Sequence, residues 1–204
     1  MTRHIYIVDD DESVRASLHS LLGRIDDLAI RSYRSGDAFL AARAELDAGV
    51  ILLDMHMPGA SGLDVLRAVA AEGGHFAPIV ITGQGDTGLA VNSMKAGAVD
   101  FIEKPFDHKH LMSVITEAYS VLEETTAIAN RARDAREKLA LLSPRERNVL
   151  DGLIAGHANK VIAYDHGISP RTIEIYRANL MDKLGAQTLS DVLRIAYNAG
   201  LISP

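Results

Sequence analysis

The chain has 204 residues, of which 48% are hydrophobic, no cysteine, and a formal net charge of −6. This length allows one or two domains, and the lack of cysteine excludes disulfides, thiolate-bound zinc and thiol catalysis. No apolar stretch approaches the ~18–20 residues that a membrane-spanning helix needs, so we expect no membrane partner. A strand pattern begins by residue 4 without the apolar segment of a secretory signal, so we expect a cytoplasmic protein.

The charge is distributed unevenly along the chain. Residues 1–121 carry ten basic and seventeen acidic residues, residues 122–138 carry four of each, and residues 139–204 carry seven basic and six acidic residues. The asymmetry indicates different partners for the two ends. A C-terminal excess of one positive charge does not identify a DNA-binding domain by itself. If this part of the chain binds DNA, so small an excess predicts only modest nonspecific affinity for it.

Residues 1–121 alternate between short apolar runs and helical patterns. The runs predict five strands, at 4–8, 28–33, 50–53, 78–82 and 99–102. Apolar residues at helical spacing predict intervening helices at about 13–23, from 35 through 40, and at 61–71, with a fourth that ends at Gly97 in a left-handed cap. We therefore expect an α/β domain with a doubly wound, flavodoxin-like parallel sheet of five strands.

The central run of this domain, residues 49–53, stops at a carboxylate, Asp54. Such a run is typical of a strand that is buried on both faces, and in open α/β sheets the chemistry lies beyond the carboxyl ends of the strands. Asp9, Asp10 and Asp11 follow the first strand, Thr82 ends the fourth, and Lys104 follows the fifth. Each alone is typical of a solvated loop, a helix cap or a surface lysine, but together they predict a site.

Clustered carboxylates repel one another and need a cation, and Mg²⁺ prefers oxygen ligands. With this ion bound, Asp54 can act as the nucleophile toward a phosphoryl group. Lys104 would hold a phosphate oxygen, and Thr82 would donate a hydrogen bond to it. The sequence therefore predicts a phosphoryl-accepting site with Mg²⁺ as its cofactor.

A second region begins after residue 138. From residue 107 an apolar stripe continues at helical spacing through Leu111, Ile115, Ala118, Leu122, Ala129, Ala132, Arg136 and Leu139. Residues 122–138 mix both charge signs without proline or glycine, which indicates a helical linker that either pairs with its copy in a dimer or is a solvated spacer.

Ser143, Pro144 and Glu146 then form a strong helix start with a capping box. Residues 139–204 are expected to form four helices that include a helix-turn-helix motif, with helices at 159–166, at 170–184 and at 189–199.

The first region resembles the receiver domain of two-component response regulators over residues 1–121. The resemblance rests on Val8-Asp9-Asp10, on residues 53–59 around Asp54, on Thr82-Gly83, and on residues 94–106. It implies that Asp54 takes phosphate from a histidine kinase, and that Asp9, Asp10, Asp54 and the His56 carbonyl hold Mg²⁺. It also implies a cis peptide at Lys104-Pro105, a switch pair of Thr82 and Phe101, and tuning of dephosphorylation by His56 and Gln84. The ring of His56 is disfavoured as a ligand because Mg²⁺ prefers oxygen, and His108 and His110 are expected at the surface.

Residues 139–204 resemble the LuxR-type helix-turn-helix, and in particular its FixJ-like members, through residues 159–165 and 169–180. The resemblance implies that the third helix enters the major groove, where Glu174, Ile175 and Ala178 could contact base edges. The DNA-binding residues would be Lys160, Arg171, Thr172, Glu174, Ile175, Arg177 and Ala178, with Lys160, Arg171 and Arg177 on phosphates. Glu174 could instead be an exposed acid that repels DNA, and Tyr176, where relatives often have His, is favoured as a core aromatic residue.

Together the two resemblances predict a DNA-binding transcriptional response regulator. Its partners would be a sensor histidine kinase, promoter DNA, a second copy on phosphorylation through a surface near Val91, Lys95 and Phe101, and RNA polymerase. We expect no substrate turnover. A phosphatase with an aspartyl-phosphate intermediate is disfavoured because His56 stands where a second acid is needed. An FMN carrier is disfavoured because Asp9–Asp11 would repel its phosphate, and the Ser169-Pro170 helix start argues against a scaffold that binds only protein.

Overall fold

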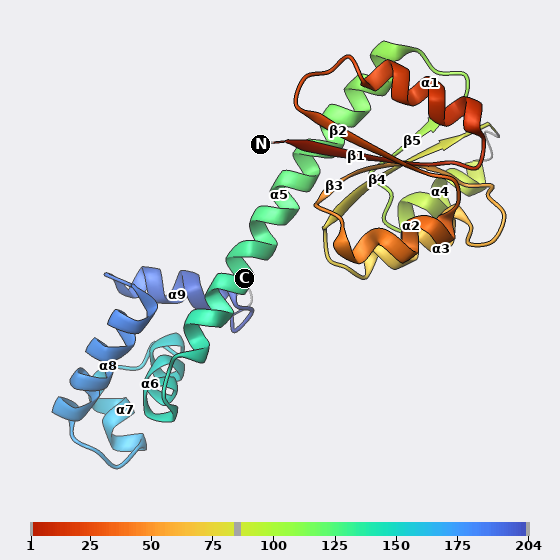
Figure 1. Ribbon diagram of the computed structural model, residues 1–204. Helices are drawn as coiled ribbons and strands as arrows, with labels where there is room; N and C mark the ends of the chain where they lie inside the picture. The colour runs from red at the N-terminus through yellow and green to blue at the C-terminus, as the bar shows by residue number, and fades with distance from the viewer. Residues whose placement is uncertain (1, 84–86, 203–204) are drawn as a thin grey trace. The chain divides into compact units, whose positions relative to one another are not determined.

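The computed structural model describes residues 2–83 and 87–202, and it divides into two compact units between Thr126 and Ala127. The first unit is a parallel sheet with helices on both faces (Figure 1). Its five strands are β1 (Arg3–Val8), β2 (Leu28–Tyr33), β3 (Gly49–Asp54), β4 (Phe76–Thr82) and β5 (Asp100–Glu103). They are ordered β2-β1-β3-β4-β5, which confirms the predicted sheet.

Two separate cores cover the two faces of this sheet. The helices are α1 (Glu12–Leu22), α2 (Gly36–Ala42), a short 3₁₀ helix η1 (Arg43–Glu45), α3 (Gly62–Ala70), α4 (Thr87–Lys95) and α5 (His108–Ala140). On one face Val50 and Leu52 pack against α1 and α5. On the other, Ile51 and Leu53 pack against α2 and α3. Every residue of β3 is buried, as the uninterrupted apolar run predicted.

Local signals in the sequence fix the helix boundaries of this unit. The side chain of Asp11 accepts a hydrogen bond from the Ser13 amide and caps α1. Ser61 and Asp64 form a capping box at the start of α3. Gly97, expected at the end of α4, has a φ of 102°, which a residue with a side chain rarely adopts. Gln84, which was expected to flank the site, lies outside the described residues.

The second unit is a bundle of short helices built on the end of α5. It contains α6 (Pro144–Ile154), α7 (Asn159–Asp165), α8 (Pro170–Leu184) and α9 (Leu189–Asn198). Their apolar faces share one core that includes Leu150, Ile173, Leu180 and Val192. Gly185 ends α8 in the left-handed region, at φ 63°, as expected for a glycine that follows a helix.

The expected stripe along α5 is correct in its first part and at Leu139, its last member, but not at Ala129 and Arg136 between them. Leu111, Ile115, Ala118 and Leu122 are buried in the first unit, but Ala129 and Arg136 are exposed, and Ala135 is buried with Leu139 in the core of the second unit. A single stripe assumes a single packing surface. Because α5 contributes to two cores, the spacing of its first half does not extend into its second half. In the described part of the chain, no helix is long and apolar enough to cross a membrane.

The start of α6 is joined to the end of α8 by a buried carboxylate. Glu146 is 4% exposed, and its Oε2 atom accepts hydrogen bonds from the Ser143 amide and from Lys183 Nζ, both at 2.7 Å. The hydrogen bond from Lys183, followed by that from the Ser143 amide, lowers the pKa of Glu146 below its ordinary value of 4.5. The capping box predicted from Ser143 and Glu146 is therefore also a tertiary contact.

A lowered pKa makes this contact sensitive to acid. The stabilisation by ionised Glu146 is complete above about pH 4.5, the pKa in the unfolded chain, and is lost as the pH falls through the lower folded-state pKa. We expect Glu146→Gln to lower the free energy of unfolding by about 1–2 kcal/mol at neutral pH, because Lys183 is partly exposed and screened. In urea denaturation followed by circular dichroism, the gap to wild type should be smaller at an acidic pH below 4.5 than at neutral pH. A gap of equal size at both pH values would contradict the prediction, and Glu174→Gln, an exposed acid on α8, is the control.

Candidate functional site

Three of the residues expected at the sheet edge meet at one point. Lys104 Nζ lies 3.0 Å from Asp9 Oδ2 and 3.1 Å from Asp54 Oδ1. Asp9 follows β1, Asp54 ends β3, and Lys104 follows β5, so three parallel strands deliver these groups to the same edge. The peptide bond between Lys104 and Pro105 is cis, as expected.

Both carboxylates of this cluster are largely removed from solvent. Asp9 is 3% and Asp54 8% exposed, whereas Asp10 is exposed and does not join the ion pairs. Burial raises the pKa of Asp9, although the hydrogen bond from Lys104 opposes the shift. For Lys104, burial alone would lower the pKa, but the hydrogen bonds and charges of Asp9 and Asp54 outweigh it and raise the pKa. The lysine is thus held as a cation between the two acids.

Backbone amides orient the remaining oxygen of each acid. Asp54 Oδ2 accepts a hydrogen bond from the His56 amide at 2.7 Å, and Asp9 Oδ1 accepts one from the Asp11 amide at 2.8 Å. His56 itself is exposed, like His108 and His110. Because each acid has one oxygen on an amide and the other on Lys104, the site is pre-organised for a positive charge at its centre.

Arg15 is a site residue that the sequence did not reveal. Its Nη1 atom donates a hydrogen bond to the backbone carbonyl of Asp9 at 2.7 Å, from the first turns of α1. This bond fixes the turn between β1 and α1, in which Asp9 and Asp10 lie. The contact depends on how the helix folds back on the strand, so residue spacing gives no signal for it.

The two expected switch residues lie on neighbouring strands. Thr82 ends β4 and is fully buried, and its carbonyl accepts a hydrogen bond from the Lys104 amide at 2.7 Å. Phe101 lies in β5 and is half-buried against the core on the α2 and α3 face. The geometry places Thr82 next to the residue that carries the ammonium group, while Phe101 lies on the adjoining strand.

The site fits a hard divalent cation. Among residues 2–83 and 87–202, no three histidine, aspartate or glutamate side chains form a group that could hold a metal ion by themselves. Mg²⁺, however, usually binds through one or two carboxylates and completes its shell with waters and phosphate oxygens. Asp9 and Asp54 already converge on one ammonium group, so their oxygens suit such an ion.

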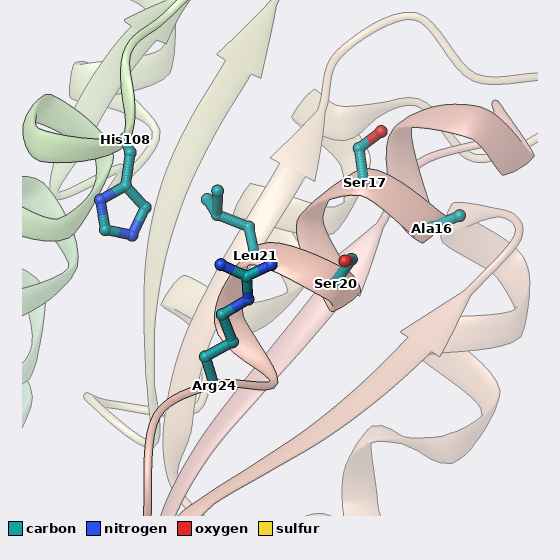
Figure 2. Close-up of a pocket in the computed structure, with 6 residues that line it drawn as sticks. All are labelled: Ala16, Ser17, Ser20, Leu21, Arg24 and His108. Carbon is teal, nitrogen blue, oxygen red and sulfur yellow. The ribbon is translucent and has the colours of Figure 1, made fainter.

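Two cavities lie along α1, and one of them includes a residue of this site. One, of about 670 Å³, is lined by Ala16, Ser17, Ser20, Leu21, Arg24 and His108, and Figure 2 shows His108 facing α1 across it. It contains none of the acidic residues. The other, of about 300 Å³, is lined by Val14, Leu18 and Leu21 of α1 and by Lys104, Pro105 and Phe106, and Ser13 and Ser17 complete it. The second cavity therefore reaches the ammonium-bearing residue from the side of α1.

In the second unit, the outer surface of α8 carries the residues expected to contact DNA. Arg171, Glu174, Ile175 and Ala178 are exposed on α8, and Lys160 is exposed on α7. Tyr176 is half-buried against the core, as favoured from the sequence. Thr172 is half-buried, and its amide donates to Ser169 Oγ, so its first role is in the helix cap.

Arg177 also has a partner that the sequence did not predict. Its Nη1 atom donates a hydrogen bond to Asn159 Oδ1 at 3.2 Å, and both residues are half-buried. The bond joins the first residue of α7 to the middle of α8. Eighteen residues separate the two side chains, so only the crossing of the helices brings them together.

Comparisons with known proteins match both units. The family model of the response regulator receiver domain matches residues 5–116, and the model of bacterial regulatory proteins of the luxR family matches residues 140–196. The transcriptional regulatory protein FixJ of Bradyrhizobium diazoefficiens is 43% identical over 200 residues, covering 98% of this chain and 97% of that protein. FixJ of Azorhizobium caulinodans is 46% identical over 201 residues, covering 97% and 93% of the two chains.

Solved structures agree with these matches. The response regulator StyR aligns with a TM-score of 0.83 at 30% identity, covering 97% of this chain and 99% of its own. Full-length FixJ from B. japonicum aligns with a TM-score of 0.59 at 42% identity, over the whole of both chains.

Proposed function

Since this chain belongs to the two-component response regulators, with a receiver domain followed by a LuxR-type DNA-binding domain, we propose that phosphorylation of Asp54 controls its binding to promoter DNA. The observation that carries the proposal is the position of Asp54. It is a buried carboxylate at the end of the central strand, held 3.1 Å from Lys104 Nζ. A sensor histidine kinase is the phosphoryl donor that a receiver domain implies.

The chain's own residues account for the transfer. A carboxylate oxygen of Asp54 attacks the phosphorus atom, and the bond between phosphorus and the donor breaks. Lys104, already a cation at this point, would then hold an oxygen of the transferred group, and the Thr82 hydroxyl would donate a hydrogen bond to it. Lys104 has three N–H donors, so its ammonium group could bond the transferred group as well as Asp9 and Asp54.

Mg²⁺ is the cofactor that we assign to this site. Asp9 and Asp54 would supply two carboxylate oxygens, and Asp10 and the His56 carbonyl would complete the protein ligands. When bound, the ion offsets negative charge on the transferring group.

Dimerisation would convert this local event into DNA binding. Val91 and Met94 on α4 are each 48% exposed, and Lys95 is exposed beside them, next to β5. Pairing of two copies through this surface would present two DNA-binding units to two half-sites, which raises affinity without new base contacts. We propose functional boundaries at 1–121 for the receiver, 122–138 for the linker and 139–204 for the DNA-binding domain. Action would be in the cytoplasm, with RNA polymerase as a further partner and without substrate turnover.

The test is a mass and size measurement on one sample. The full chain is incubated with a small phosphodonor and Mg²⁺, and its intact mass and oligomeric size are measured. Addition of one phosphoryl group with a shift from monomer to dimer supports the proposal. Absence of labelling would contradict phosphoryl acceptance, and labelling without a change in size would contradict the role of dimerisation.

A further inference from the structure

The bond between Asn159 and Arg177 lies where the two helices of the helix-turn-helix meet. Asn159 is the first residue of α7, and Arg177 lies in the middle of α8. Their contact, Arg177 Nη1 to Asn159 Oδ1 at 3.2 Å, is partly buried. The bond therefore holds the N-terminal end of α7 against the side of α8 that carries Arg177.

Arg177 lies on the flank of α8 between its buried and its exposed faces. Ile173, Leu180 and Leu184 face the core, and Arg171, Ile175 and Ala178 are exposed. Lys160 is exposed and directly follows Asn159 in the chain. The corner of the unit where α7 begins against α8 therefore carries Arg177, and Lys160 is the next residue of the chain after its partner Asn159.

This corner is where a helix-turn-helix is expected to meet the DNA backbone. In this motif the second helix enters the major groove while the first crosses the phosphates beside it. An arginine on the flank of α8 nearest to α7 would then face the DNA backbone that borders the major groove. A guanidinium carries five N–H donors, so one bond to Asn159 is compatible with a bidentate contact to a phosphate.

We propose that Asn159 is a positioning residue for DNA binding, which holds the guanidinium of Arg177 in place to contact a backbone phosphate. The proposal rests on the DNA-binding function of the second unit. Arginine side chains lose considerable rotamer freedom when they bind, and a partner that fixes the side chain beforehand reduces that loss. Asn159 itself need not touch the DNA.

Asn159 can be replaced without weakening its helix. The N-cap of α7 is Ala158, which makes no side-chain capping bond, so the Asn159 side chain is not required to start the helix. Alanine also has a higher helix propensity than asparagine. A loss of DNA affinity in Asn159→Ala would therefore not be explained by loss of α7.

The experiment uses the full chain, phosphorylated on Asp54 with a small phosphodonor and Mg²⁺, and a fluorescein-labelled DNA duplex of arbitrary sequence. Contacts to phosphates do not depend on sequence, so no operator is needed. Anisotropy titrations over a series of salt concentrations give an affinity and a salt slope for wild type, Asn159→Ala, Arg177→Gln and the double variant. Asn148→Ala, a half-buried asparagine on α6, is the matched control, and thermal unfolding verifies that each variant is folded.

We expect Asn159→Ala to weaken duplex binding by about two- to tenfold, the effect of one lost hydrogen bond, with an unchanged salt slope. Arg177→Gln should weaken binding further and reduce the slope by about 0.9, the value for one phosphate contact. In the Arg177→Gln background, Asn159→Ala should have no added effect.

Two outcomes would overturn the proposal. If Asn159→Ala binds like wild type, the bond does not position Arg177 for DNA. If its effect adds fully to that of Arg177→Gln, Asn159 acts independently of Arg177. A phosphorylated wild-type chain without salt-dependent duplex binding would instead contradict the DNA-binding function, which is a distinguishable failure.

Discussion

Replacing Asp54 with asparagine is expected to abolish phosphoryl labelling of the chain. The rate with a small phosphodonor and Mg²⁺ should fall by at least about 10³-fold, because the amide has no nucleophilic carboxylate oxygen. Asparagine has nearly the same shape, and its side-chain oxygen can still accept the hydrogen bond that Asp54 accepts from the His56 amide. The variant should therefore fold, and the loss would be chemical. Intact mass spectrometry against wild type measures it.

Two neighbouring substitutions make this prediction specific. Glu103→Gln removes an exposed acid from the end of β5, on the same edge of the sheet, and should label like wild type. Asp10→Asn keeps the nucleophile but removes a proposed ligand of the ion, so it should label slowly and respond to added Mg²⁺. Wild-type labelling of Asp54→Asn would place the phosphoryl group on another residue, which peptide mapping would identify.

The parts of this site that were predictable from sequence are those at the ends of regular elements. An apolar run that stops at Asp54 predicts both a buried strand and an acid at its carboxyl end. The same few residues carry both signals, because the site of an open α/β sheet lies where its strands end. The same holds for Lys104 after β5 and for the Ser143 capping box. Each of these is local in sequence, so the pattern and the structure depend on the same interactions.

The residues that sequence reasoning missed are held by contacts between elements. Arg15 reaches the carbonyl of Asp9, and Asn159 reaches Arg177, only because a helix crosses its neighbour at a particular point. No periodicity encodes that crossing. The second half of α5 shows the same limit, because Ala135 is buried by a different core from the one that buries Leu122. Lys104 is an intermediate case, in which its presence at the edge was predictable but its central place between both acids was not.

A second large effect is expected at Leu180, because the second unit has a hydrophobic core of its own. This residue is fully buried in the second unit, among side chains of α6, α7 and α9 that do not belong to the cores around the sheet. Leu180→Ala should lower the free energy of unfolding of that unit by about 2–5 kcal/mol, through lost transfer energy and the cavity left behind. A small helical unit has a total stability of about 4–12 kcal/mol, so its melting temperature should fall by about 10–30 °C.

The consequence for function should be confined to DNA binding. Leu180→Ala should lose duplex binding as the second unit melts, while phosphoryl labelling of Asp54 continues at the wild-type rate. Leu52→Ala is the matched variant in the first unit, where Leu52 is 1% exposed beneath α1 and α5 on the strand that carries Asp54. It should reduce labelling and leave the melting of the second unit unchanged. If both variants lowered labelling and duplex binding in parallel, the two units would unfold together. The loss of packing in one unit would then have to be transmitted to the other through α5.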